Sequence, residues 1–177
     1  KNYKPDKQHL QKHKSWDDAI PYVTSPATIY QTNSIKIFLT DFTKVLKPSN
    51  ACTTPVCKAL VNEINNAQSS IDFAIYGYTK VPVIQSALEK ARQRGVRIRF
   101  VYDLDQNNKN IYPDTNYLAE ILTSNRHDSV NSIMHDKFFI FDNKIVMTGS
   151  ANISNTDMSG FNSNVVVFVN SEGIADI

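Results

Sequence analysis

Hydrophobic and polar positions follow two different periods along the first half of the chain, and the periods predict strands and helices in turn. Residues 34–40 (SIKIFLT), 70–78 (SIDFAIYGY) and 96–103 (VRIRFVYD) are the predicted strands. Between them, apolar residues recur at helical spacing in two stripes, first Val56, Leu60, Val61, Ile64 and Ala67, then Ile84, Ala87, Leu88 and Ala91. This alternation of strands and helices predicts an α/β fold in which helices cover parallel strands.

Both predicted helices carry recognisable ends. Thr53 or Thr54 can cap the first helix, with Pro55 in its first turn. The second helix ends in RQRG, which places basic residues in the last turn and Gly95 where a left-handed cap is favoured.

The second half predicts fewer helices and a hairpin. Residues 115–125 predict a short helix, residues 126–132 a polar loop, residues 133–150 a hairpin with DNK at its turn, and residues 164–169 a final strand. Residues 171–177 (SEGIADI) read as the start of a helix that stops before it is finished. We therefore expect one domain over residues 29–177, with order beginning near Ile29.

Residues 1–28 predict a basic, loop-like N-terminal arm. Its first fourteen residues hold five lysines and two histidines with almost no apolar spacing, and Pro21 and Pro26 interrupt the rest. A solvated terminus is the usual meaning of such a charge run, and contact with an anionic polymer or membrane surface is the alternative.

Composition narrows the class of protein only modestly. The 177 residues suit one globular domain, and a net charge of +2 permits a phosphate-binding groove without demanding an extended nucleic-acid surface. The chain begins at Lys1 rather than Met, which fits a trimmed chain or a mature protein whose leader was removed. Cys52 and Cys57 are either bridged, as suits an oxidising compartment, or two reduced thiols. We expect a secreted or periplasmic protein.

The hairpin carries the candidate chemistry. Alternate side chains of a strand share one face, so His135 and Lys137 are predicted to point to the same place. Phe139 and Phe141 follow on that face and are expected to pack in the core. An imidazole can attack or shuttle protons near neutral pH, and an ammonium supplies fixed positive charge for phosphate oxygens. These two types of residue together indicate a phosphodiester site.

The loop after the hairpin adds further candidates. Asn152 offers an uncharged donor, and Gly149 and Ser150 are small enough to let the backbone approach a phosphate. We interpret Ser150 as a hydrogen-bonding residue, because no G-x-S-x-G nucleophile motif surrounds it. Asp142 falls at the hairpin turn on the opposite face from His135, so we interpret it as structural. No cluster with metal-ligand spacing accompanies these residues, so we expect no metal and no cofactor.

The full pattern is H-x-K, four residues, D, six residues, then G-S-x-N, and it resembles the signature of the phospholipase D superfamily. The resemblance extends over roughly residues 35–174, because residues 59–79 and 87–103 are similar to the helix, strand, helix, strand run that precedes this motif in the family. It implies a phospholipase D-like α/β sandwich with a mixed, mostly parallel sheet flanked by helices. It also implies hydrolysis through a phosphohistidine, with a second histidine protonating the leaving oxygen.

Two features leave alternatives open. Family sites use two copies of the motif and this chain holds one, so the second comes from a homodimer mate or from a C-terminal half outside this chain. Family members often place a carboxylate after G-S-x-N to hold the imidazole, where this chain has Ser163 and Asn164. Asn164 is then the candidate to orient His135, which is either nucleophile or general acid. The substrate is phospholipid or nucleic acid, and a catalytically silent domain that binds anionic lipid or nucleic acid is the alternative function.

Overall fold

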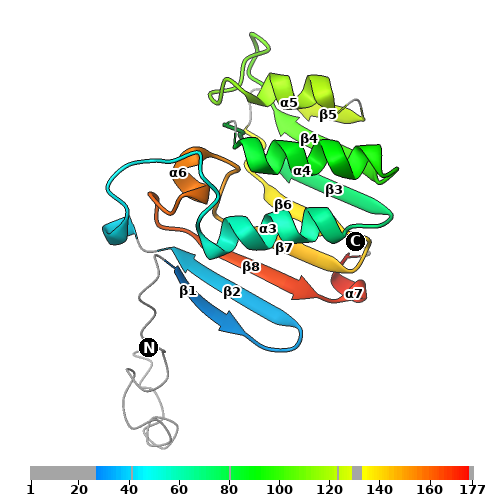
Figure 1. Ribbon diagram of the computed structural model, residues 1–177. Coiled ribbons are helices and arrows are strands. Elements are labelled where there is room, and N and C mark those ends of the chain that lie inside the picture. Colours follow the sequence, from blue (N-terminus) through cyan, green and yellow to red (C-terminus); the bar gives the residue numbers. More distant parts are fainter. Residues whose placement is uncertain (1–26, 41, 80, 123, 129–132, 176–177) are drawn as a thin grey trace, which may run out of the picture.

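The strands form one eight-stranded sheet in the order β1-β2-β8-β7-β6-β3-β4-β5 (Figure 1). The computed structural model describes residues 27–175 apart from 41, 80, 123 and 129–132, so most of the predicted N-terminal arm lies outside the described residues. The strands are β1 (Ala27–Gln31), β2 (Ile35–Thr40), β3 (Ser70–Ile75), β4 (Arg97–Asp103), β5 (Asn125–Asp128), β6 (Lys137–Phe141), β7 (Ile145–Gly149) and β8 (Val165–Asn170).

The sheet is mixed, as expected, but the prediction that it is mostly parallel is wrong. Only β3 with β4 and β4 with β5 pair in parallel, whereas the other five neighbouring pairs are antiparallel. The physical reason lies in the hairpin, because β6 pairs antiparallel with β3 and brings β7 and β8 with it. Parallel pairing is thus confined to the part of the sheet whose strands are joined through helices.

Two amphipathic helices, α3 (Pro55–Asn66) and α4 (Pro82–Gln93), lie over one face of the sheet (Figure 1). Their apolar stripes are buried as predicted, with Leu60, Ile64, Ile84 and Leu88 fully enclosed. Burial of each such side chain contributes about 1.5–3 kcal/mol. Beneath them the rings of Phe73, Phe100 and Phe139 stack at centroid distances of 4.5–4.6 Å. The prediction that Phe139 and Phe141 belong to the core is confirmed.

The helix ends agree with the sequence signals. The Thr54 side chain accepts a hydrogen bond from the Cys57 amide at 3.2 Å, and Gly95 adopts a φ of +90° after α4. Cys52 and Cys57 form a disulfide with a Cα separation of 5.4 Å, inside the permitted window, so the bridged alternative holds in the structure. The Thr54 hydroxyl also donates to the Met158 carbonyl at 2.6 Å, which ties the start of α3 to the loop before β8.

The remaining elements are short. They are the 3-10 turn η1 (Phe42–Lys44) and the helices α5 (Thr115–Ile121), α6 (Asn155–Met158) and α7 (Glu172–Ala175). The helix predicted over residues 115–125 therefore ends early, because Asn125 begins β5, and β1 starts two residues before Ile29. None of the described helices has the length and apolarity needed to cross a membrane.

The register places many loops at one edge of the sheet. Strands β2, β3, β4 and β7 end at this edge, and β6 and β8 begin there. The loops after β3 and β4, the segment before β6 and the loop from β7 to β8 consequently lie at the same edge, which we call the loop edge (Figure 1).

Candidate active site

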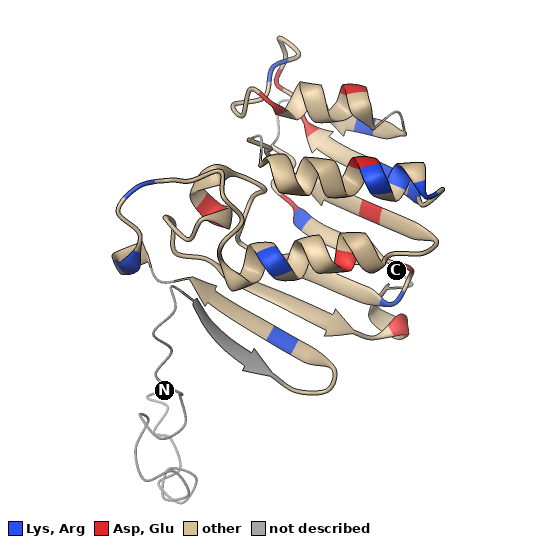
Figure 2. Cartoon of the chain, viewed as in Figure 1, with Lys and Arg blue, Asp and Glu red and all other residues tan. Residues whose placement is uncertain are grey.

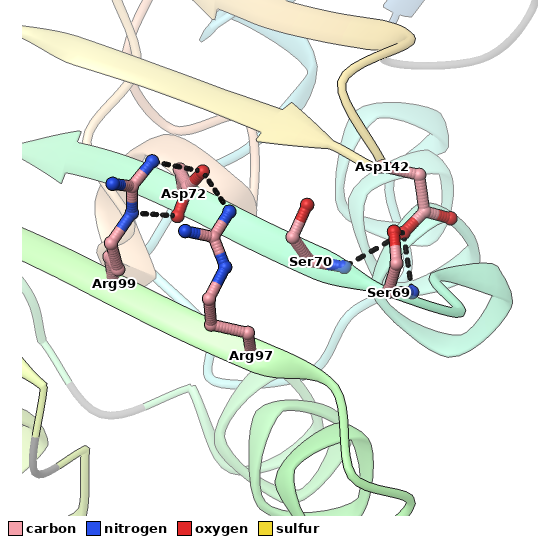
Figure 3. A network of polar contacts seen from close by, with 6 residues as sticks. All are labelled: Ser69, Ser70, Asp72, Arg97, Arg99 and Asp142. Atoms are coloured by element: carbon pink, nitrogen blue, oxygen red, sulfur yellow. Dashed lines mark hydrogen bonds and ion pairs between the residues drawn. The ribbon is translucent and has the colours of Figure 1, made fainter.

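Asp142 anchors the hairpin at the end opposite the loop edge. Asp142 and Asn143 have φ angles of +53° and +50° in the three-residue turn between Phe141 and Ile145, which the Lys144 amide closes by donating to the Phe141 carbonyl at 2.9 Å. The Asp142 carboxylate accepts hydrogen bonds from the backbone amides of Ser69 and Ser70 at 2.8 and 2.9 Å and from the Ser69 hydroxyl (Figure 3). It also accepts from the Gln68 amide at 2.9 Å. Partial burial acts to raise the pKa of this carboxyl, but the hydrogen bonds together lower it below its usual value. The Asp142 carboxylate thus makes structural contacts, but its partners lie in residues 68–70 and not within the turn, where the sequence led us to expect them.

His135 and Lys137 meet at the other end of the hairpin, on the ring of Tyr76. The strand begins at Lys137, so His135 lies just before it rather than within it. The exposed His135 ring stands edge-on to Tyr76 with centroids 4.7 Å apart, and the Lys137 ammonium lies 5.4 Å from the Tyr76 centroid. Lys137 Nζ also donates to the His135 carbonyl at 2.9 Å. The two motif side chains therefore share one location, as predicted.

Burial and two nearby carboxylates act on the pKa of the Lys137 ammonium in opposite directions. Partial burial lowers the pKa of its ammonium below the usual value, and the carboxylates of Asp157 and Asp136 offset part of that shift. A cation near an aromatic face gains about 0.5–1 kcal/mol at an exposed site. The ammonium is thus placed to meet an anion while remaining only partly solvated.

Gly149 and Ser150 make contacts that join β7 to β8, whereas the sequence suggested that they let the backbone approach a phosphate. A Cβ on Gly149, whose φ is +154°, would overlap the carbonyl oxygen of Val165 in β8. The Ser150 hydroxyl donates to Asn164 Oδ1 at 2.8 Å and accepts from the Val165 amide at 3.1 Å. The structure thus explains the small residue at 149 by the close approach of two strands, and it shows Ser150 as a hydrogen-bonding residue.

Asn152 is buried beside Tyr112. Its Nδ2 donates to the Tyr112 hydroxyl at 3.3 Å, and its side-chain oxygen is buried without a hydrogen-bond partner among the described residues. The Tyr112 ring in turn stands edge-on to Tyr76 at 6.0 Å. Asn152 is therefore joined to His135 and Lys137 through two tyrosines, and its side-chain oxygen is a buried acceptor that no described donor satisfies.

Asn164 does not lie where the sequence placed it. Its amide accepts from Ser150 and donates to Asp157 Oδ1 at 3.2 Å and to the Asn162 carbonyl at 3.4 Å. A bond to His135 is not among the hydrogen bonds of the described residues. The structure therefore places Asn164 in a network behind the site instead of against the imidazole.

Sequence reasoning missed Tyr76, Tyr112 and Asp157. Tyr112 lies in the loop after β4, which Asn110 ties down by donating to the carbonyls of Tyr76 and Asp103 at 2.7 and 2.8 Å. Burial, with the Asp157 charge, raises the pKa of the Tyr112 phenol, so it stays protonated near neutral pH. Asp157 had one detectable signal, since Ser154 three residues earlier predicts a helix cap, and the Ser154 hydroxyl does accept from the Asp157 amide.

The described residues hold no group of three or more His, Cys, Asp or Glu that could ligate a metal ion. The site instead offers an accessible imidazole, an ammonium and a phenol, with the buried Asn152 carboxamide hydrogen-bonded to that phenol. Those groups suit nucleophilic attack on phosphorus, neutralisation of its non-bridging oxygens and hydrogen bonding to them. The fold and the site together define an α/β domain whose loop edge presents groups suited to a phosphodiester.

Comparison with known proteins identifies the family. Residues 60–177 match the family model described as "Cardiolipin synthase, PLD-like domain", and the chain belongs to this phospholipase D-like family. The solved phospholipase D family member Nuc from Salmonella typhimurium is 31% identical, with a TM-score of 0.57, over 67% of this chain and 78% of that chain. The family predicted from the motif is confirmed.

Curated relatives are similar over part of their length. Phospholipase D of Rickettsia felis is 33% identical over 59% of this chain and 53% of its own. Mitochondrial cardiolipin hydrolase of Mus musculus is 29% identical over 64% of this chain and 50% of its own. The chain thus spans about half the length of these relatives.

Proposed function

We propose that this domain is a phosphodiesterase that works without a metal ion, through a phosphohistidine, at a site completed by a second H-x-K motif. The observation that carries the proposal is the convergence of the exposed His135 imidazole and the Lys137 ammonium on Tyr76 at the loop edge. Asn152 is linked to this pair, because it donates to the Tyr112 hydroxyl and the Tyr112 ring contacts Tyr76. Relatives named phospholipase D and cardiolipin hydrolase support a phosphodiester substrate.

The proposed reaction has two displacements at phosphorus. One histidine attacks, forming an N–P bond as the P–O bond to the leaving group breaks, and the second histidine gives its proton to the departing oxygen. The second histidine, now neutral, takes a proton from water, and the water oxygen displaces the first histidine from phosphorus. His135 is one of this pair, and both roles stay open for it. Lys137 neutralises the non-bridging oxygens throughout.

The second motif comes from a homodimer mate or from a C-terminal half that follows this chain. His127 does not supply it, because it lies on β5 with its ring 5.7 Å from that of Tyr102, and no lysine stands two residues beyond it. A symmetric dimer would bring two copies of His135 to one twofold axis.

The substrate is a phosphodiester of a phospholipid or of a nucleic acid. The basic run at residues 92–99 gives little support to nucleic acid, because Asp72 pairs with Arg97 at 3.0 Å and with Arg99 at 2.7 Å (Figure 3). Figure 2 shows the Lys and Arg of the last turn of α4 gathered near that run, at the edge where β4 begins, opposite the loop edge. This cluster is remote from His135.

Hydrolysis of a chromogenic phosphodiester in excess EDTA tests the function, followed by phosphatidylglycerol vesicles and single-stranded DNA as separate substrates. We expect wild-type turnover in EDTA and a loss of roughly 10²-fold or more in His135→Ala. His127→Ala is the matched control, since it removes an exposed imidazole that contacts Tyr102 and lies on β5, three strands from β6 in the sheet. Equal activity in wild type and in folded His135→Ala would overturn the mechanism.

The second candidate, a silent domain that binds anionic lipid or nucleic acid, is favoured by one observation. Residues 163 and 164 are Ser and Asn where relatives often carry a carboxylate that steadies the imidazole. Absence of turnover on all three substrates, together with His135-dependent binding of vesicles or DNA, would select this candidate.

We also propose that the protein is secreted or periplasmic. The Cys52–Cys57 disulfide supports this, since such bonds persist in oxidising compartments. The mass of the natural protein after thiol alkylation without reduction tests it, and two alkylated thiols would contradict it.

A further inference from the structure

The loop between β7 and β8 buries a carboxylate that the motif does not account for. Asp157, in α6, is 4% exposed. Its Oδ2 accepts from the Asn152 amide at 2.7 Å, and its Oδ1 accepts from Asn162 Nδ2 at 2.6 Å and from Asn164 Nδ2 at 3.2 Å. All three donors are uncharged, and no Lys or Arg forms an ion pair with it in the part of the chain that the structure describes. A buried carboxylate held only by neutral donors is costly and needs a reason.

The partners of Asp157 supply a first reason. Asn152 and Asn164 are two of the residues singled out in the motif region, and Asn164 in turn accepts from Ser150. One carboxylate therefore fixes both ends of the G-S-x-N segment and the start of β8. The bond from the Asn152 backbone amide to Asp157 fixes the backbone of Asn152. It thereby positions the Asn152 side chain, whose Nδ2 donates to Tyr112.

Charge supplies a second reason. Lys137 is partly buried, and its ammonium lies near the Tyr76 ring. In the described structure the Lys137 ammonium lies by the Tyr76 ring and donates to the His135 carbonyl, and the carboxylates whose charge acts on it are Asp136 in its own segment and Asp157 in α6. Asp157 is joined to Tyr76 by way of Asn152 and the ring of Tyr112. Of the two carboxylates, Asp136 is exposed and screened by water, whereas Asp157 is buried.

We propose that Asp157 is the positioning carboxylate of the phosphate site, which holds Asn152 and Asn164 in place and balances the charge of Lys137. The inference rests on the proposed function for its catalytic consequence. Relatives often place a carboxylate on the strand after G-S-x-N, but Ser163 stands there in this chain, and the α6 turn supplies the charge instead. Asp157 acts through its neighbours and is not a catalytic residue.

An exchange of two side chains separates charge from hydrogen bonding. Asp157→Asn alone sets an amide against three donors, so it risks misfolding. The double variant Asp157→Asn/Asn162→Asp keeps a carboxylate-to-amide pair and the net charge but moves the charge to an exposed position. Asn162→Ala is the matched control, because it removes one donor from Asp157 and leaves its charge in place.

The direct readout is the titration of the Lys137 ammonium by NMR on the isolated protein, with the signal assigned through Lys137→Arg. Loss of a nearby negative charge disfavours the ammonium, so we expect the titration midpoint to fall by about half a pH unit or more in the double variant. We expect no fall in Asn162→Ala. The alkaline limb of kcat should move to lower pH by the same amount, with kcat reduced roughly 10-fold and KM changed less.

A midpoint that stays at the wild-type value in the folded double variant would overturn the proposal, as would an equal fall in Asn162→Ala. The titration does not depend on turnover. A wild-type protein without phosphodiesterase activity whose Lys137 midpoint still falls on exchange would therefore reject the proposed function and keep the assignment of Asp157.

Discussion

At the scale of single residues, the motif letters divide into chemistry and scaffold. His135 and Lys137 present an imidazole and an ammonium at the loop edge. Asp142 lies at the far end of the same hairpin, where its carboxylate accepts hydrogen bonds from the backbone amides of residues 68–70. These donor amides belong to the connection from α3 to β3 and to Ser70, the first residue of β3. This carboxylate therefore joins the hairpin to the first part of the sheet.

The lowered pKa of Asp142 gives a pH-dependent prediction. Its contribution to the free energy of unfolding is fully present above the unfolded pKa near 4 and is lost as pH falls through the folded pKa, because the protonated acid accepts fewer hydrogen bonds. Asp142→Asn should lower the free energy of unfolding at pH 7 by about 1–3 kcal/mol. The gap to wild type should close below about pH 4.

Urea unfolding at pH 7 and pH 3 measures this effect, with Glu120→Gln on the exposed face of α5 as the control for lost charge. Phosphodiesterase activity should change little in Asp142→Asn, since His135 lies at the other end of β6. A gap that stays the same at both pH values would contradict the role assigned to the carboxylate.

Gly77 gives the second prediction at this scale. A Cβ there would overlap the ring of Tyr112, so Gly77→Ala should displace the tyrosine that Asn152 contacts. Overpacking of this kind costs about 1–3 kcal/mol. Thermal unfolding and kcat should both fall, whereas Gly173→Ala, with open space around its Cβ, should leave both unchanged. Wild-type kcat in Gly77→Ala would show that Tyr112 has no part in the site.

At the scale of elements, the sequence predicts what periodicity encodes. The stripes of α3 and α4, the three strands around them and the hairpin with its DNK turn follow from local spacing. The missed strands, β1 and β5, are the two edges of the sheet, and NRHD in β5 has no apolar alternation at all. Each depends on pairing with a neighbour rather than on its own pattern.

Sheet order and loop contacts lie beyond local patterns for a related reason. Strand, helix, strand spacing predicts parallel pairing of β3 with β4, but nothing local indicates that β6 pairs antiparallel on the other side of β3. The site shows the same limit. The spacing of the motif located His135, Lys137 and Asn152, whereas Tyr112 and Asp157 reach them from irregular segments that carry no period.

At the scale of the whole molecule, the sheet collects the motif side chains His135, Lys137 and Asn152 at the loop edge, and the Asp142 contacts lie at the opposite edge. Tyr76 follows β3, His135 precedes β6 and Asn152 follows β7, and the register brings these three ends together. The His135 imidazole is exposed at this edge. Under the proposed mechanism, the second histidine would approach His135 at this exposed edge, from another copy of the chain or from another half of the protein.

Mixing wild-type and His135→Ala chains distinguishes the two arrangements. Differently tagged chains are co-expressed in equal amounts, and the mixture is assayed without separation. If two copies of His135 build one site on a twofold axis, only pure wild-type dimers turn over, so activity should fall to about one quarter of that of the wild type at equal total protein. If the second motif lies in the same chain, each chain works alone and activity should fall to about one half.

The intact mass and the solution mass of the protein are measured alongside, because they fix which chain length is being mixed. A 20.0 kDa chain that is a dimer and retains one quarter of the activity would place the second histidine on the partner. A longer chain that retains one half would place the second histidine downstream. A dimer of the 20.0 kDa chain that retains one half would contradict the shared site, since each copy would then need no histidine from its mate.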